Sequence, residues 1–328
     1  METTQGNELL SVRNLKTYFY LSQGHVKAVD GIDLTIPRQK AVGLVGESGC
    51  GKSATALSIM RLLPSPPSKI LDGKVLFKGK DLIKLSEKEL REIRGKEISM
   101  VFQDPMTFLN PVLKIGDQIG ETILEHQPVK KADVKEKVVE LLEHVGIPGA
   151  RDVVDYYPHQ LSGGMRQRVL IAMALSCNPS LVIMDEPTTA LDVTIQRQIL
   201  ELIKDLIKDY DMSLMLITHD LGVVAEICDY IYIMYAGRIL EQADVYTIFE
   251  AAKHPYTRGL LASALSIEEH REKLVGLDGS VPDLMAPPPG CKFHPRCSHA
   301  KDACRAEEPP LMELESGHFV RCWLEGDA

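Results

Sequence analysis

Hydrophobic and polar positions alternate with two different periods along this chain. Apolar residues occupy every second position at Ile32, Leu34 and Ile36, and the run 41–45 is apolar throughout. Alternation by two and short apolar runs are typical of strands. These segments lead into a glycine-rich turn, after which a helix is predicted from Lys52 onward. The pattern therefore predicts strands, a turn and a helix in that order.

A further strand, helix and strand are predicted between residues 181 and 218. The short apolar runs 181–184 and 214–218 suit central strands that are covered on both faces. Between them, apolar residues recur at helical spacing and charged residues occupy the other side. The apolar set is Ile195, Ile199, Leu202, Ile203 and Leu206. This alternation predicts an α/β body with a mixed, largely parallel sheet.

The rest of the chain divides into a helical insertion and a C-terminal region. Strand signals fade from residue 112 and charged helical patterns such as 132–145 take over, so we expect a helical subdomain over about 112–165. Further helical segments follow residue 240. Three prolines and a glycine at 287–290 then form a stiff break before a group of cysteines. We expect a main domain over 1–265 and a small module over 266–328.

Composition narrows the classes of protein that this chain can belong to. Its 328 residues are 45% apolar and 25% charged, which is ordinary for a folded protein of roughly two domains. The 37 basic and 46 acidic residues give a net charge of −9. An acidic balance is unfavourable for broad phosphate-backbone binding, so no nucleic-acid partner is expected. No apolar run approaches the roughly 20 residues of a membrane span and the start is polar, so a cytoplasmic chain is predicted.

Residues 46–53 read Gly-Glu-Ser-Gly-Cys-Gly-Lys-Ser, which fits the phosphate-loop pattern between a predicted strand and a predicted helix. Glycines let the backbone N–H groups point at phosphate oxygens, and the helix N-terminus adds positive potential. Lys52 is predicted to neutralise the β- and γ-phosphates, and Ser53 to hold Mg²⁺. The predicted nucleotide contacts of this loop are Gly46, Ser48, Gly49, Cys50, Gly51, Lys52, Ser53 and Ala54.

The apolar run 181–184 ends in two carboxylates, Asp185 and Glu186. A strand of this kind delivers Asp185 to the metal, directly or through water, and leaves Glu186 able to orient or deprotonate an attacking water. Two acidic residues after a buried strand are often just the start of a solvent-exposed loop, without a catalytic role. With a phosphate loop upstream, the catalytic interpretation is favoured.

Residues 161–168, Leu-Ser-Gly-Gly-Met-Arg-Gln-Arg, resemble the signature segment of the ATP-binding subunits of ABC transporters, which is rare outside that family. The segment opens a predicted helix, so the hydroxyl of Ser162 and the N–H groups of Gly163 and Gly164 can grip a γ-phosphate. The resemblance implies the ABC cassette of the P-loop nucleotide hydrolases, with ATP and Mg²⁺ as cofactors, and hence 1–265 as a nucleotide-binding domain.

Further segments are similar to the remaining motifs of that family, in the family's order. Gln103 resembles the glutamine that touches Mg²⁺ and water and senses the transport domains. Residues 190–192, Ala-Leu-Asp, resemble the D-loop and place Asp192 at the nucleotide. His219 resembles the catalytic switch histidine. The aromatic that stacks on adenine is assigned to Phe19, with Tyr18 and Tyr20 as alternatives.

The resemblance also implies an assembly. In this family the signature of one subunit completes the phosphate site of the other, which implies a head-to-tail dimer with ATP at the interface. The second subunit is either a copy of this chain or a homologous partner. Two transmembrane permease subunits and, indirectly, an extracytoplasmic solute-binding protein are the other implied partners. The subunit is then expected at the cytoplasmic face of the cell membrane, as a peripheral protein.

Two C-terminal segments resemble the oligopeptide and dipeptide importers in particular. They are 254–261, His-Pro-Tyr-Thr-Arg-Gly-Leu-Leu, and 293–297, Phe-His-Pro-Arg-Cys. The implied function is an ATPase motor for peptide import, with nickel or another small solute as the alternative cargo. A DNA-repair or chromosome-organising ATPase on the same cassette is disfavoured, because the chain has no sustained heptad or basic face. A ribosome-associated factor with tandem cassettes would need a second phosphate loop.

Four cysteines close to the C-terminus have the spacing C-x5-C-x6-C-x17-C. The spacing lacks the paired C-x2-C steps of most zinc ribbons and suits the wider anchors of a [4Fe-4S] cluster, a site that the peptide-importer resemblance also implies. Zn²⁺ is the alternative, two disulfides are disfavoured, and His294, His299 or His318 could replace a ligand. A structural role for the site is the default expectation. The predicted ligands are Cys291, Cys297, Cys304 and Cys322.

Overall fold

The computed structural model describes residues 7–189, 191–268 and 277–325. Two compact units make up the fold. The first unit combines the chain up to Lys84 with the chain from Leu216, and the second unit is Leu85–Met215. The side chains of each unit are therefore described within that unit.

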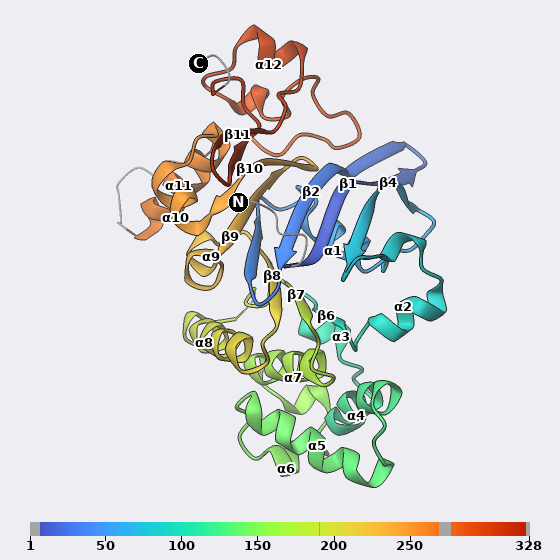
Figure 1. Cartoon of the computed structure of the whole chain (residues 1–328). Coiled ribbons are helices and arrows are strands. Elements are labelled where there is room, and N and C mark those ends of the chain that lie inside the picture. The colour runs from blue at the N-terminus through green and yellow to red at the C-terminus, as the bar shows by residue number, and fades with distance from the viewer. Residues whose placement is uncertain (1–6, 190, 269–276, 326–328) are drawn as a thin grey trace. The chain divides into compact units, whose positions relative to one another are not determined.

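An antiparallel sheet occupies the first part of the first unit. Its strand order is β2-β1-β4-β5, and every neighbouring pair is antiparallel (Figure 1). The predicted strand around Ile32, Leu34 and Ile36 is the end of β2, and all three side chains are buried. The strands are β1 (Glu8–Leu21), β2 (Gly24–Pro37), β4 (Ser68–Phe77) and β5 (Lys80–Asp81).

A second sheet of the first unit is mixed. Strand β3 lies parallel to β9, whereas the pairs β9–β10, β10–β12 and β12–β11 are antiparallel. Only Ala236 and Gly237 separate β9 from β10, and so short a connection can join only antiparallel neighbours. The sheet is therefore mixed, as expected, but antiparallel pairs outnumber parallel ones among these strands. The strands are β3 (Ala41–Val45), β9 (Tyr230–Tyr235), β10 (Arg238–Asp244), β11 (Met312–Glu315) and β12 (His318–Val320).

The helices of the first unit include the predicted one that begins at Lys52. Strand β8 (Ser213–Thr218) runs from the second unit into the first along the chain. The helical segments are α1 (Lys52–Ile59), η1 (Leu82–Lys84), α9 (Leu221–Ile227), α10 (Val245–Ala251), α11 (Pro255–Glu268), η3 (His294–Arg296) and α12 (Asp302–Ala306).

Helices dominate the second unit, where strands β6 (Ile98–Val101) and β7 (Leu181–Asp185) form a parallel pair. All five residues of β7 are buried, as its apolar sequence predicts. Helices α4, α5 and α6 lie together in the stretch where strand signals fade (Figure 1). The helical segments are α2 (Glu87–Ile93), α3 (Pro105–Phe108), α4 (Ile115–His126), α5 (Lys131–His144), α6 (Ala150–Val153), η2 (Pro158–Gln160), α7 (Gly163–Leu175) and α8 (Val193–Asp209).

Within the part of the chain that the structure describes, no helix is both long enough and apolar enough to cross a bilayer.

Candidate functional site

The phosphate loop connects β3 to α1 and is pressed against neighbouring main chain by its glycines. A Cβ atom on Gly46 would lie 2.1 Å from the carbonyl oxygen of Met234, and one on Gly51 would lie 2.1 Å from that of Ala28. Gly51 also has a φ of +112°, a conformation that side chains disfavour. The curl of the loop therefore requires glycine at both positions.

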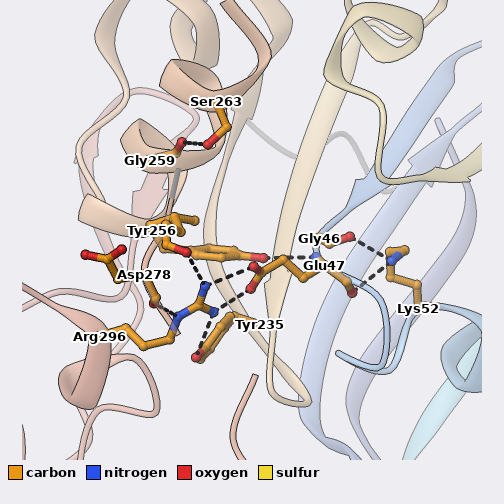
Figure 2. Close-up of polar contacts among 10 residues, drawn as sticks. Gly46, Glu47, Lys52, Tyr235, Tyr256, Gly259, Ser263, Asp278 and Arg296 are labelled. Atoms are coloured by element: carbon orange, nitrogen blue, oxygen red, sulfur yellow. Dashed lines mark hydrogen bonds and ion pairs between the residues drawn. The ribbon is translucent and has the colours of Figure 1, made fainter. Parts of the chain in front are cut away.

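Lys52 closes the loop on itself. Its Nζ donates to the carbonyl oxygens of Gly46, at 2.7 Å, and Glu47, at 3.1 Å (Figure 2). Gly51, the N-cap residue of α1, makes no side-chain hydrogen bond to the first N–H groups of that helix. A Cβ on Gly49 would have open space around it. Backbone donors, a lysine and an open rim fit a bound triphosphate.

The other predicted residues of this loop differ in exposure. Ser48 and Gly49 are exposed, whereas Ser53 and Ala54 are half-buried in the first turn of α1. Cys50 is buried, and desolvation by burial raises the pKa of its thiol to about 11. Its thiol is therefore neutral near pH 7 and serves as a small packing group in the loop.

The second unit brings Gln103 and Glu186 together. The Nε2 of Gln103 donates to Oε2 of Glu186 at 3.0 Å, and the hydroxyl of Thr189 donates to the same oxygen at 2.9 Å. Glu186 follows the buried Asp185 at the end of β7 and has a φ of 47°, in the left-handed region. Two donors therefore orient one carboxylate. Sequence reasoning missed Thr189, although a hydroxyl three positions after Glu186 was the available signal.

The signature residues stand at the start of α7. Ser162 caps this helix, because its Oγ accepts from the N–H of Met165 at 3.3 Å. Ser162 and Gly163 are exposed, whereas Gly164 is buried and a Cβ there would lie 2.6 Å from Ile195 on α8. The start of the helix therefore offers a hydroxyl and N–H groups to the surroundings of the subunit.

Asp192 caps α8 in the same way. Its Oδ1 accepts from the N–H of Ile195 at 3.0 Å, and the side chain is exposed. Ala190, the first residue of the predicted D-loop, lies outside the described residues. The described D-loop residues thus belong to the second unit, as do Gln103, Asp185, Glu186 and the signature.

His219 and the predicted adenine-stacking aromatic belong to the first unit. His219 is exposed directly after β8. Phe19 is half-buried on β1, whereas Tyr18 is tied down by a hydrogen bond from its hydroxyl to Oδ1 of Asp30 at 2.6 Å. Tyr20 packs against the ring of His25. Of the three, Phe19 therefore stays the predicted aromatic.

Comparisons with known proteins match this arrangement of motifs. The family model for ABC transporters matches residues 29–189, and that for the oligopeptide/dipeptide transporter C-terminal region matches residues 240–304. The oligopeptide transport ATP-binding protein AppD of Bacillus subtilis is 52% identical over 316 residues, with 96% of each chain covered. The chain belongs to the ABC transporter ATP-binding subunits of the peptide-importer branch.

Other relatives and solved cassettes agree. The dipeptide transport ATP-binding protein DppD of Bacillus subtilis is 49% identical, covering 97% of this chain and 95% of that one. The dimeric cassette MJ0796 bound to ADP and Pi matches with a TM-score of 0.65 and 26% identity, over 72% of this chain and 98% of that one. Cassette cbiO1 from Clostridium perfringens has a TM-score of 0.62 and 28% identity, over 75% and 92% of the respective chains. The predicted cassette fold and ATPase class are confirmed.

The cysteine-ligated site predicted for this peptide-importer subunit is not supported. Its four cysteines are free thiols, and the described residues contain no group of three or more His, Cys, Asp or Glu side chains that could hold a metal ion. Desolvation by burial raises the pKa of Cys291 and of Cys322 to about 11, with smaller contributions from neighbouring thiols. Neither a [4Fe-4S] cluster nor Zn²⁺ is therefore assigned to Cys291, Cys297, Cys304 and Cys322.

The histidines considered as replacement ligands have other contacts. Nδ1 of His294 lies 2.9 Å from the carbonyl oxygen of Cys291, and Nε2 of His318 lies 2.8 Å from Oε1 of the buried Glu241. The backbone N–H of His299 is hydrogen-bonded to Cys297. The ring contacts agree with structural roles for His294 and His318.

The C-terminal region instead reaches the phosphate loop through Tyr256, which sequence reasoning missed. The Tyr256 hydroxyl accepts from the backbone N–H of Glu47 at 3.0 Å, and its own backbone N–H donates to Nδ1 of His254 at 3.0 Å. The backbone N–H of His254 in turn donates to Glu241 at 3.0 Å. The buried His254 thus fixes the start of α11, from which Tyr256 contacts the loop.

Acid should weaken this arrangement through His254. Burial, with a smaller effect from the charge of Arg258, lowers the pKa of His254 to about 3, against about 6.5 in an unfolded chain. Between these values the unfolded state binds the extra proton, so stability is full above pH 6.5 and falls as pH decreases. We expect this residue to account for about 2 kcal/mol of lost unfolding free energy between pH 6.5 and 5. Urea unfolding of the wild type and of His254→Gln measures it, and equal pH slopes would contradict it.

Proposed function

We propose that this subunit hydrolyses MgATP to drive the import of dipeptides and oligopeptides through membrane permease partners. The single observation that carries the proposal is the pairing, in one chain, of an ABC cassette with a matched oligopeptide/dipeptide transporter C-terminal region. The curated relatives at about 50% identity are oligopeptide and dipeptide transport ATP-binding proteins. Nickel as cargo is not favoured, because neither match points to it.

The proposed triphosphate site is the phosphate loop. Backbone N–H groups of Gly46 and of residues 48–54 bind the phosphates, and Lys52 neutralises the β- and γ-phosphates. Mg²⁺, when bound, neutralises charge on the phosphate oxygens, and Ser53, Gln103 and Asp185 are the residues that would hold it. Phe19 is proposed to stack on adenine. The close packing of the loop at Gly46 and Gly51, which leaves no room for a Cβ, supports this assignment.

Glu186 is the proposed base that orients and deprotonates the attacking water. The hydrogen bonds from Gln103 and Thr189 support this role, because they leave the carboxylate one defined orientation. Gln103 then links the position of this base to the part of the cassette that senses the transport domains. His219 is proposed to contact the γ-phosphate as the switch histidine.

The proposed working form is a head-to-tail dimer with a second ABC ATPase subunit, which is either a copy of this chain or a homologue. Ser162, Gly163 and Gly164 of one subunit would contact the γ-phosphate held by the other, together with Asp192. Exposure of Ser162, Gly163 and Asp192 supports this proposal, because within their own unit no packing covers them. A matched cassette is described as dimeric with ADP and Pi.

The remaining proposals concern organisation. Residues 1–265 would form the nucleotide-binding domain, with a helical subdomain over about 112–165, and residues 266–328 the peptide-importer extension. Two permease subunits would dock beside Gln103 and the helical subdomain, with the solute-binding protein acting on the other side. Exposed Val112 and Leu113, on the segment before α4, support an interaction surface there. The subunit would then lie peripherally on the cytoplasmic face of the cell membrane.

Reconstitution tests the proposed cargo. The subunit would be copurified with its permease partners and solute-binding protein and reconstituted into lipid vesicles. The ATPase side would face the lumen, and the labelled solutes would be added outside, on the binding-protein side. We expect MgATP to drive accumulation of a labelled dipeptide or a short oligopeptide, and each peptide to raise ATP hydrolysis. A labelled Ni²⁺ salt serves as the comparison. Uptake of nickel with no uptake of either peptide would overturn the proposal.

A further inference from the structure

The glutamate in the phosphate loop is held by an arginine from the C-terminal region. Nη1 of Arg296 lies 2.6 Å from Oε2 of Glu47, and Nη2 lies 3.0 Å from Oε1, so the guanidinium and the carboxylate are joined by two parallel bonds (Figure 2). A paired contact of this kind fixes orientation as well as distance. The carboxylate of Glu47 therefore has its direction set from outside the loop.

Arg296 is itself fixed before it reaches the loop. Its Nε donates to the carbonyl oxygen of Asp278 at 2.7 Å, and its side chain is only 5% exposed. The guanidinium lies 5.7 Å from the ring centre of Tyr235 and 5.9 Å from that of Phe293. Aromatic rings beside a guanidinium stabilise it and hold its plane. Arg296 is therefore a rigid support.

Glu47 is also gripped through its main chain. Its N–H donates to the hydroxyl of Tyr256, and its carbonyl oxygen accepts from Nζ of Lys52. One residue thus connects two supports from the C-terminal region to the lysine of the phosphate loop. Movement at Arg296 or Tyr256 would be transmitted to Lys52 through the single residue Glu47.

Charge gives the ion pair a second consequence. Glu47 places a carboxylate one residue from Gly46 in a loop proposed to bind an anionic triphosphate. An unpaired carboxylate there would repel the phosphates, whereas the paired guanidinium cancels its charge. The guanidinium is 5% exposed and the carboxylate 29%, so salt weakens this compensation less than it would weaken a fully exposed pair.

We propose that Arg296 is a positioning residue of the ATP site, which neutralises and orients Glu47 so that the phosphate loop accepts the triphosphate. The C-terminal extension thereby sets nucleotide affinity, while the proposed base, Glu186, is left unchanged. This inference rests on the proposed assignment of the loop to the triphosphate, and it adds a role for the extension that no motif of the cassette supplies.

Steady-state ATP hydrolysis by the assembled transporter tests the inference. Arg296→Ala should raise the KM for ATP about tenfold and change kcat by less than about twofold, because it removes loop positioning and leaves Glu186 untouched. Arg296→Lys should restore part of the affinity, since lysine supplies charge without the paired geometry. Adding Glu47→Gln to Arg296→Ala should lower KM again, because the repelling charge is gone.

Arg321→Ala is the matched control. Arg321 also lies in the C-terminal region and donates to the carbonyl oxygens of Ile239 and Pro309, at 3.1 Å each, without contacting the phosphate loop. We expect this variant to keep the wild-type KM. An equal rise in KM for both arginine variants, or an unchanged KM in Arg296→Ala, would overturn the inference. Lys52→Ala distinguishes failure of this inference from failure of the proposed function. Retained ATP binding in that variant would overturn the assignment of the loop to the triphosphate.

Discussion

ATP hydrolysis should fall by roughly a hundredfold to ten-thousandfold in the Glu186→Gln variant, while ATP binding persists. Glutamine keeps the size of the side chain and an oxygen that can accept from Gln103 and Thr189. It cannot take a proton from water near neutral pH, so the loss is confined to the chemical step. Phosphate release by the assembled transporter measures turnover, and equilibrium binding of a fluorescent ATP analogue measures affinity.

Glu201→Gln is the control for this substitution. Glu201 is an exposed glutamate on α8 that pairs with Arg197 at 3.3 Å, so its replacement removes the same charge away from the proposed catalytic carboxylate. We expect near wild-type turnover in the control. Wild-type turnover in Glu186→Gln would instead remove Glu186 from the mechanism and leave its contact with Gln103 as a structural one.

Loss of ATP binding is the expected result for Lys52→Ala, with the dissociation constant raised by about a hundredfold or more. The substitution removes a buried cation from the proposed phosphate site. It also removes the donor to the carbonyl oxygens of Gly46 and Glu47, so the loop loses an internal tie as well as its charge. Both effects disfavour the bound triphosphate.

Thermal unfolding with and without MgATP measures this effect. A ligand at one hundred times its dissociation constant stabilises the folded state by about 2.7 kcal/mol. The wild type should therefore unfold at a higher temperature with MgATP, and Lys52→Ala should not respond. Lys40→Ala is the control, because Lys40 is an exposed lysine whose ion pair is with Asp229. An undiminished MgATP shift in Lys52→Ala would place the triphosphate elsewhere.

The nucleotide motifs could be predicted from the sequence because their chemistry is local. A phosphate loop needs its glycines and lysine within a few positions, and helix caps such as Ser162 and Asp192 act on the N–H three residues ahead. The apolar run ahead of Asp185 likewise reports its burial directly. These features can be recognised from a few neighbouring residues, whatever the rest of the fold.

Contacts between distant parts of the chain could not be predicted in this way. The pair Glu47–Arg296 joins residues separated by 249 positions. The residues next to each of them in the sequence do not reveal its ion-pair partner. The antiparallel pairing of β1 with β4 could not be predicted either, because an alternating pattern indicates a strand but not the strand with which it pairs. The cysteine spacing was misleading, since it counts positions along the chain and contains no information on how buried thiols are arranged.

The first unit is assembled from two separate stretches of chain, and this affects how the protein can fold as it is made. Strand β3 lies parallel to β9, with Val42 opposite Tyr230, yet the whole second unit lies between them in sequence. During synthesis, the second unit can therefore fold before the N-terminal stretch of the first unit is complete, because the ribosome has not yet released β9 and the later strands. Until they arrive, the unpaired edge of β3 is exposed to other nascent chains, and binding by chaperones would be most useful in that interval.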